Sequence, residues 1–169
     1  MPIQLDPDLP APLIPLAWLV GVWAGAGVVG YPTMEDTRFG QEVVFGHDGR
    51  PFLSYSSRTW LLDEAGERVR PLASETGYWR PAGQGPTGGT GLEVLLAHPM
   101  GIVEIYVGSV DGPRVTLETD VVARTGTATE YTAATRMYGL VEGDLLWVME
   151  MAAVGQPLGA HASARLRRA

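Results

Sequence analysis

The feature that most constrains the fold is a series of short segments in which apolar and polar residues alternate. Between these segments lie Gly- and Pro-containing runs such as 63–67 (DEAGE), 111–113 (DGP) and 141–144 (VEGD). Alternation with a period of two is typical of β-strands, and Gly and Pro supply the backbone angles that tight turns need. No segment of helical length places apolar residues at i, i+3, i+4 and i+7. The pattern predicts an all-β chain with ten strands, at 23–29, 38–46, 52–60, 72–80, 91–97, 101–109, 114–122, 129–140, 144–153 and 158–167.

The connections between these segments are of hairpin length, which predicts an antiparallel up-and-down meander. A meander of ten strands leaves two sheet edges, and closure into a barrel removes both of them. A ten-stranded β-barrel that encloses one small ligand is therefore the expected fold, with a β-sandwich as the second architecture. We expect one domain over residues 13–169, a helical turn or two within 13–20, and a flexible N-terminal arm over residues 1–12, which hold four prolines.

Composition excludes several classes of function. The chain has no cysteine, so disulfides, zinc–thiolate sites, iron–sulfur clusters and thiol catalysis are excluded. Its net charge of −7 disfavours nucleic acid and anionic membranes as partners. The N-terminal residues do not form a secretory signal, so a cytoplasmic protein is expected, and no protein partner is indicated. We interpret the arginines of the tail, at positions 165, 167 and 168, as a solvated chain end.

The run Gly21-Val22-Trp23-Ala24-Gly25-Ala26-Gly27 is the most distinctive local pattern. Glycines at alternate strand positions remove side chains from one face, so another backbone or a flat ligand can approach closely. Trp23 is expected to plug the floor of the barrel.

Three histidines, His47, His98 and His161, are the candidate metal ligands, because a neutral imidazole binds iron well and cysteine is absent. His47 and His98 have the sequence context of turn residues. Strand alternation groups His161 with Ser163 and Arg165 on the outer face of the last strand, and an inward side chain would require a wet, open end of the barrel.

Arg136 and Tyr138 share one face of their strand and could hold a carboxylate together, although we interpret them as solvent-facing. No nucleophile elbow or P-loop is present, and the glutamates at 42, 75, 93 and 104 lie on different strands with no reason to pair as acid and base.

Several ordered segments resemble the nitrobindin family of haem proteins, whose ten-stranded barrel is similar to those of fatty-acid-binding proteins and lipocalins. The resemblance spans most of the chain and includes the glycine-rich run, Tyr31-Pro32-Thr33, His47-Asp48-Gly49-Arg50-Pro51-Phe52, Glu75-Thr76-Gly77-Tyr78, Ala97-His98-Pro99-Met100-Gly101 and Gln156-Pro157-Leu158 with His161. It implies one haem b per chain, with His161 as the proximal iron ligand. It also implies nitric oxide binding and isomerisation of peroxynitrite to nitrate, with no catalytic residue beyond the haem iron.

The resemblance also assigns cofactor contacts to Thr33, Leu72 and Met151, each of which could instead be a turn or core residue. Where relatives carry a lysine that contacts a haem propionate, this chain has Thr129. Two alternatives stay open at this stage. One is a carrier of fatty acid or another apolar carboxylate held by Arg136 and Tyr138, and the other is a nitric oxide sensor or carrier without turnover.

Overall fold

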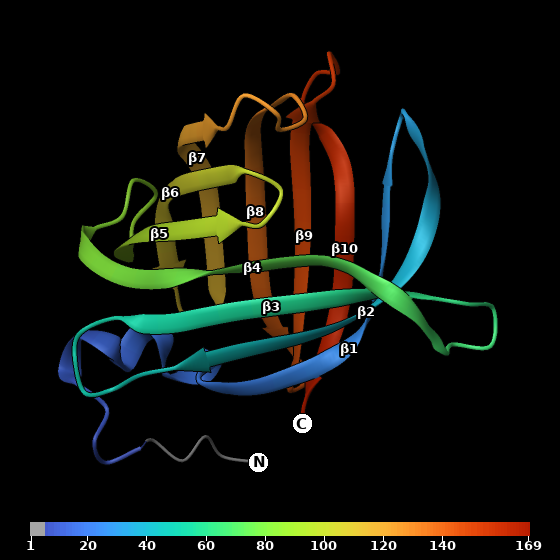
Figure 1. Ribbon diagram of the computed structural model, residues 1–169. Coiled ribbons are helices and arrows are strands. Elements are labelled where there is room, and N and C mark those ends of the chain that lie inside the picture. The colour runs from blue at the N-terminus through green and yellow to red at the C-terminus, as the bar shows by residue number, and fades with distance from the viewer. Residues whose placement is uncertain (1–5) are drawn as a thin grey trace.

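The computed structural model describes residues 6–169 and shows a closed barrel of ten antiparallel strands (Figure 1). The strands follow one another around the barrel in chain order, and the last strand pairs with the first. The strands are β1 Gly21–Tyr31, β2 Met34–Gly46, β3 Leu53–Leu62, β4 Arg68–Gln84, β5 Thr90–His98, β6 Ile102–Asp111, β7 Arg114–Arg124, β8 Tyr131–Val141, β9 Asp144–Ala153 and β10 Gly159–Arg168. The predicted up-and-down barrel is therefore confirmed, and the β-sandwich is wrong.

Some boundaries differ from the prediction. β4 continues through Pro81 to Gln84. Pro81 still pairs with Leu92, and the register with β5 shifts between Pro81 and Gln84. At the N-terminus a 3₁₀ helix, η1, spans Ala11–Leu19 and so includes the end of the expected arm. Residues 1–5 of that arm lie outside the described residues.

Helix η1 closes one end of the barrel. Leu13, Leu16 and Leu19 are fully buried there, and the indole N–H of Trp23 donates to the carbonyl of Leu19 at 2.9 Å. Trp23 is itself fully buried, which confirms that it plugs the floor. The opposite end is formed by the β1–β2, β3–β4, β5–β6, β7–β8 and β9–β10 turns, and we call it the mouth (Figure 1).

The end of the chain is also tied to the floor. Arg168 donates to the carbonyls of Trp18 and Val20, each at 2.7 Å, and its guanidinium lies 4.2 Å from the ring centre of Trp23. Arg168 is exposed, as expected for the arginine tail, but its side chain also satisfies carbonyls at the end of η1.

The glycines of β1 allow close backbone approach. A Cβ atom at Gly25 would lie 2.2 Å from the carbonyl oxygen of Arg165, and one at Gly27 would lie 2.1 Å from that of Ser163. Both oxygens belong to β10, so the glycine-rich run serves barrel closure between the first and last strands rather than a flat ligand.

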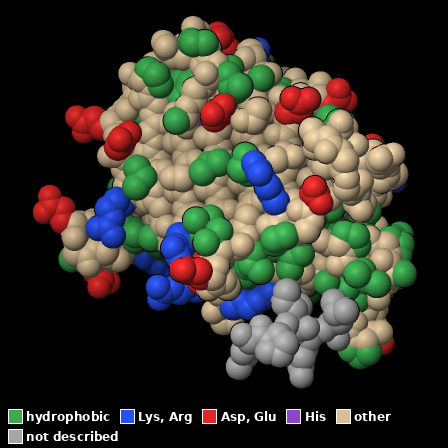
Figure 2. Space-filling view, turned by 180° about the vertical axis from the view of Figure 1, so that it is seen from behind, with side chains coloured by type: hydrophobic (Ala, Val, Ile, Leu, Met, Phe, Trp, Pro, Cys, Tyr) green, Lys and Arg blue, Asp and Glu red, His purple; other side chains and the backbone are tan. Residues whose placement is uncertain are grey.

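The outer surface follows the period-two pattern of the strands. On the face shown in Figure 2, apolar side chains are interspersed with acidic and basic ones. Among residues 6–169, no helix is long and apolar enough to cross a membrane.

Candidate functional site

A cavity of about 370 Å³ lies inside the barrel. The strand ends next to the mouth contribute an apolar wall that includes Val29, Leu72, Ile102 and Met151. Polar side chains also face the cavity. They are Gln41, Ser57, Thr59, Ser74, Glu75, His98, Arg136, the three tyrosines at 55, 131 and 138, and His161.

His161 lines this cavity because β10 bulges at this residue. Ala160 pairs with Glu150 and Ala162 pairs with Met149, so His161 has no partner on β9. The extra residue shifts the alternation, and His161 and Ala162 both contribute to the cavity wall. Regular alternation had placed His161 outward, and the bulge is the reason that this expectation is wrong.

The ring of His161 is oriented by its neighbours. Nδ1 lies 3.0 Å from the carbonyl oxygen of Gly30, and because a carbonyl only accepts, Nδ1 carries the hydrogen. The ring of Tyr31 packs edge-on at 5.9 Å between centres. Among residues 6–169 nothing bonds to Nε2, whose lone pair is thus free. Burial lowers the pKa of His161, and the charge of Arg136 lowers it further. The hydrogen bond to Gly30 raises this pKa, but burial outweighs it, so the imidazole is neutral at pH 7.

Tyr31 fixes the hairpin that carries His161. Its hydroxyl donates to the carbonyl of Met151 at 3.0 Å and accepts from the backbone N–H of Ala153 at 3.0 Å. These bonds join the end of β1 to the end of β9, just before the β9–β10 turn. Tyr31 is therefore a positioning residue for His161, a role that its place in the Tyr-Pro-Thr motif did not reveal.

Of the other expected cofactor contacts, Leu72 and Met151 lie at the cavity and Thr33 does not. Leu72 and Met151 are partly buried and line the same cavity as His161. Thr33 is exposed in the β1–β2 turn and is not part of the cavity wall, although its neighbour Met34 is. Thr129 is exposed in the β7–β8 turn at the mouth. The structure thus brings three of the four expected cofactor residues together.

Arg136 and Tyr138 point into the barrel, so their interpretation as solvent-facing residues is wrong. Arg136 is 6% exposed, and its guanidinium donates to both carboxylate oxygens of Glu75, at 2.6 and 2.8 Å. Its Nε–H donates to the hydroxyl of Tyr106 at 3.1 Å and a further N–H of Nη1 to that of Tyr138 at 3.3 Å. Nη2 also lies 3.7 Å from Oε1 of Glu104, a charge contact that is too long for a hydrogen bond, so four of the five N–H donors of Arg136 are hydrogen-bonded within the protein.

The ion pair explains how a buried carboxylate stays charged. Burial would raise the pKa of Glu75, but the charge and hydrogen bonds of Arg136 outweigh it and lower that pKa to about 2. Tyr55 supports the charged form, since its hydroxyl donates to Glu75 at 2.6 Å. The pair is bidentate and almost fully removed from water.

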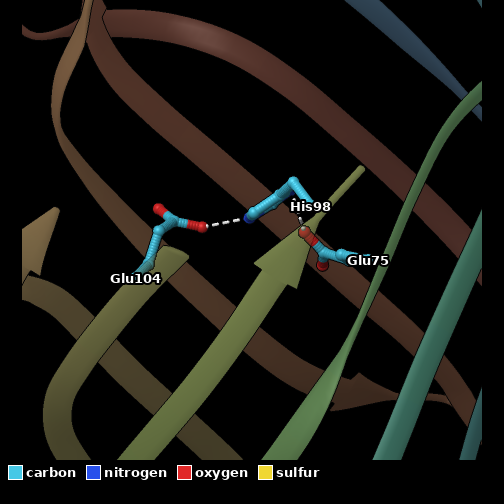
Figure 3. A group of neighbouring side chains, drawn as sticks. All are labelled: Glu75, His98 and Glu104. Atoms are coloured by element: carbon cyan, nitrogen blue, oxygen red, sulfur yellow. Dashed lines mark hydrogen bonds and ion pairs between the residues drawn. The ribbon is translucent and has the colours of Figure 1, made fainter. Parts of the chain in front are cut away.

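A second carboxylate, Glu104, lies beside this pair (Figure 3). His98 bonds to Glu104 through Nε2, and its Nδ1 lies 3.6 Å from Glu75, so the imidazole lies between the two carboxylates. The hydroxyls of Tyr106, at 2.6 Å, and of Tyr131 donate to the other oxygen of Glu104. Sequence reasoning treated His98 as a turn residue and saw no reason to pair these glutamates, because β4, β5 and β6 become neighbours only in the folded sheet.

Glu75, His98 and Glu104 offer the donor types that a metal ion prefers, with ligand atoms within 4.8 Å of one another. Arg136, however, already holds both oxygens of Glu75. Glu75 is therefore engaged in an internal ion pair, whereas Nε2 of His161 is a ligand atom at the cavity wall with no partner among residues 6–169.

Comparison with known proteins identifies the family. Residues 12–168 match the family model described as "THAP4-like, heme-binding beta-barrel domain". The chain belongs to this haem-binding family.

Named relatives match this chain along almost its whole length. A protein of Kineococcus radiotolerans named "Ferric nitrobindin-like protein" is 56% identical, and one of Leifsonia xyli named "Peroxynitrite isomerase" is 46% identical, each with 99% of both chains covered. The crystal structure of Rv2717c from M. tuberculosis matches with a TM-score of 0.83 and 41% identity, covering 96% of this chain and 99% of that one. The predicted membership of the nitrobindin family is confirmed.

The residues present fit a haem. Haem iron takes a neutral imidazole nitrogen as an axial ligand, and the second nitrogen of such a histidine usually donates to a carbonyl or carboxylate. His161 has this arrangement, with Nδ1–H held by Gly30 and Nε2 free at a cavity wall. The aliphatic and thioether side chains of Leu72 and Met151 provide apolar surface for a macrocycle beside it.

Proposed function

We propose that this chain is a ferric haem protein in which Nε2 of His161 is the axial iron ligand, and that it converts peroxynitrite to nitrate and binds nitric oxide. The observation that carries the proposal is the free Nε2 of a neutral, pre-oriented imidazole at the cavity wall, beside the apolar side chains near the mouth. The names of relatives that match almost the full length, including "Peroxynitrite isomerase", support the reaction. Leu72 and Met151 belong to this proposal as cavity contacts, and Thr33 as a contact from the rim of the mouth.

When bound, ferric haem supplies a Lewis-acidic centre at which peroxynitrite can rearrange to nitrate without gain or loss of atoms. The chain's own residues bind the haem and orient its histidine ligand. Gly30 fixes the tautomer of His161, and Tyr31 anchors the hairpin that carries it. The apolar side chains near the mouth surround the reacting molecule on part of its surface and limit the escape of fragments.

The internal network bears on the alternative of a fatty-acid carrier. A carboxylate ligand needs an available cation, yet Glu75 already occupies both terminal nitrogens of Arg136. Seating a second carboxylate would break a buried bidentate pair and leave Glu75 unpaired, which costs several kcal/mol. The geometry therefore favours haem over a carboxylate carrier.

The test is stopped-flow decay of peroxynitrite with the haem-loaded protein, followed by measurement of nitrate and nitrite. We expect faster decay with nitrate as the main product, and loss of the acceleration in His161→Ala. His47→Ala is the matched control, because His47 bonds to Asp6 and is not part of the cavity wall. Decay no faster than with free haem would refute the proposed reaction, while a spectral shift on addition of nitric oxide would separately test nitric oxide binding.

A further inference from the structure

Three tyrosines face the cavity, and their hydroxyls bond to different groups. Tyr55 donates to Glu75, whose carboxylate is already held by the guanidinium of Arg136 and is therefore a weak proton acceptor. The partners of Tyr131 and Tyr138 have opposite charges. The hydroxyl of Tyr131 donates to the carboxylate of Glu104. The hydroxyl of Tyr138 accepts from the guanidinium of Arg136 at 3.3 Å. Tyr131 begins β8 next to the mouth, whereas Tyr138 lies further along the same strand, away from it. One phenol therefore has a proton acceptor near the mouth, and the other has a cation beside its oxygen.

Glu104 accepts hydrogen bonds from several donors. It is 1% exposed and receives hydrogen bonds from Tyr131, Tyr106 and His98. Burial would raise the pKa of Glu104, but these bonds and the charge of Arg136 outweigh it and lower the pKa, so the group is ionised at neutral pH. A buried carboxylate in direct contact with a phenol can take the phenol proton without a water molecule.

We propose that Tyr131 is the residue of this chain that nitrogen dioxide oxidises and nitrates, with Glu104 as the acceptor of its proton. The inference rests on the proposed function, because homolysis of the O–O bond of protonated peroxynitrite gives one nitrogen dioxide and one hydroxyl radical, and those pairs that do not recombine to nitrate leave nitrogen dioxide in the cavity. A molecule of nitrogen dioxide that leaves the reaction site within the cavity meets the ring of Tyr131 in the cavity wall.

The chemistry balances in two steps. Nitrogen dioxide takes one electron from Tyr131 and becomes nitrite, while the phenol proton moves to Glu104. A second nitrogen dioxide then forms a C–N bond at the ring carbon next to the phenol oxygen. The hydrogen on that carbon leaves as a proton and the oxygen is reprotonated, which gives 3-nitrotyrosine.

The hydrogen bond to Glu104 makes the first step easier for Tyr131 than for Tyr138. Oxidation of a phenol that keeps its proton leaves a cationic radical, which is costly in a buried site. Transfer of the proton to Glu104 avoids this, since it yields a neutral radical and a neutral carboxyl group. At Tyr138 the nearby charge of Arg136 opposes oxidation and offers no base.

The experiment maps nitration after the haem-loaded protein is treated with a few equivalents of peroxynitrite, because each nitrated tyrosine consumes two molecules of nitrogen dioxide. Trypsin cleaves after Arg124 and Arg136, so Tyr131 is the only tyrosine in the peptide 125–136. Tyr78 is the internal reference, because it is 52% exposed on the outside, whereas Tyr131 is 7% exposed. We expect a higher degree of nitration at Tyr131 than at Tyr78. Nitration that follows exposure, with Tyr78 modified first, would overturn the inference.

Variants separate the proton acceptor from simple access to the cavity. Glu104→Gln keeps the size of the side chain and is expected to lower nitration of Tyr131 several-fold, with that of Tyr78 unchanged. Tyr138→Phe is the matched control and should leave nitration of Tyr131 as in the wild type. Circular dichroism and the haem spectrum verify that each variant is folded and loaded. If Glu104→Gln does not fold, comparison of Tyr131 with Tyr78 and Tyr138 in the wild type still decides the outcome.

Peroxynitrite decay is recorded on the same samples, so the two proposals can fail separately. Accelerated decay without preferential nitration of Tyr131 refutes this inference and leaves the proposed function intact. Preferential nitration of Tyr131 without acceleration refutes the isomerase function and supports Tyr131 as the oxidation site.

Discussion

Replacement of Arg136 by methionine tests whether the internal ion pair sets the stability of the barrel. In the wild type, Arg136 helps to lower the pKa of Glu75 from 4.5 to about 2, which corresponds to roughly 3 kcal/mol of stability. Because the folded-state pKa is the lower one, this contribution is present above pH 4.5 and is lost as the pH falls towards 2.

Without Arg136, the contribution of Glu75 to stability depends on pH with the opposite sign. Glu75 remains buried without its cation, and burial then raises its pKa above the usual value. We expect Arg136→Met to cost about 3–5 kcal/mol at neutral pH, as found when one partner of a buried pair is removed. Stability of the variant should then increase as the pH falls through the titration of Glu75, because a raised folded-state pKa contributes stability on the acid side.

The assay is urea unfolding of the haem-free protein across acid and neutral pH, followed by circular dichroism. Glu75→Gln combined with Arg136→Met should lose less stability than Arg136→Met alone, since it leaves no buried charge at this pair. Arg50→Met is the surface control, because the Arg50–Asp48 pair is exposed, and little change is expected. A cost for Arg136→Met below about 1 kcal/mol, or a pH dependence equal to that of the wild type, would refute the reasoning.

Three further predictions concern His161 and its support. His161 in the haem-free protein should titrate below its usual pKa in an NMR experiment, because burial disfavours the imidazolium, and a raised value would contradict the description of its environment. Tyr31→Phe removes two hydrogen bonds to the end of β9 and should lower the free energy of unfolding by about 1–3 kcal/mol. The variant should also lose haem to apomyoglobin faster than the wild type, and an unchanged rate of haem loss would exclude a positioning role for Tyr31. Gly25→Ala should destabilise the barrel by about 1–3 kcal/mol in thermal unfolding. Gly126→Ala is the control and should not destabilise it, because a Cβ at Gly126 meets nothing within 4 Å. Equal effects of the two substitutions would show that barrel closure tolerates a side chain at Gly25.

Local chemistry made most of the fold predictable. Turn residues between period-two segments determined the number and order of the strands, and the short connections determined the meander. Trp23 and the glycines of β1 were assigned correctly to the floor and to close backbone approach, because a large aromatic side chain and missing Cβ atoms allow few other roles.

The site was less predictable because it depends on contacts across the barrel. Alternation placed His161 outside, since a one-residue bulge leaves no clear mark in the sequence, and the family resemblance alone indicated its role. Arg136 was interpreted as solvent-facing because charged residues are rarely buried without a partner, and its partner Glu75 lies four strands away around the barrel. Neither the bulge nor the long-range pair follows from residue type and spacing.

The central claim is that Nε2 of His161 is the iron ligand, and the most direct test is the visible spectrum of the protein mixed with ferric haem. The wild type should give a sharp Soret band that shifts with nitric oxide. His161→Gly should give the spectrum of free haem, and added imidazole, which can fill the space left by the side chain, should restore the wild-type band. A His161→Gly spectrum identical to that of the wild type without imidazole would contradict the account and assign the iron to another ligand.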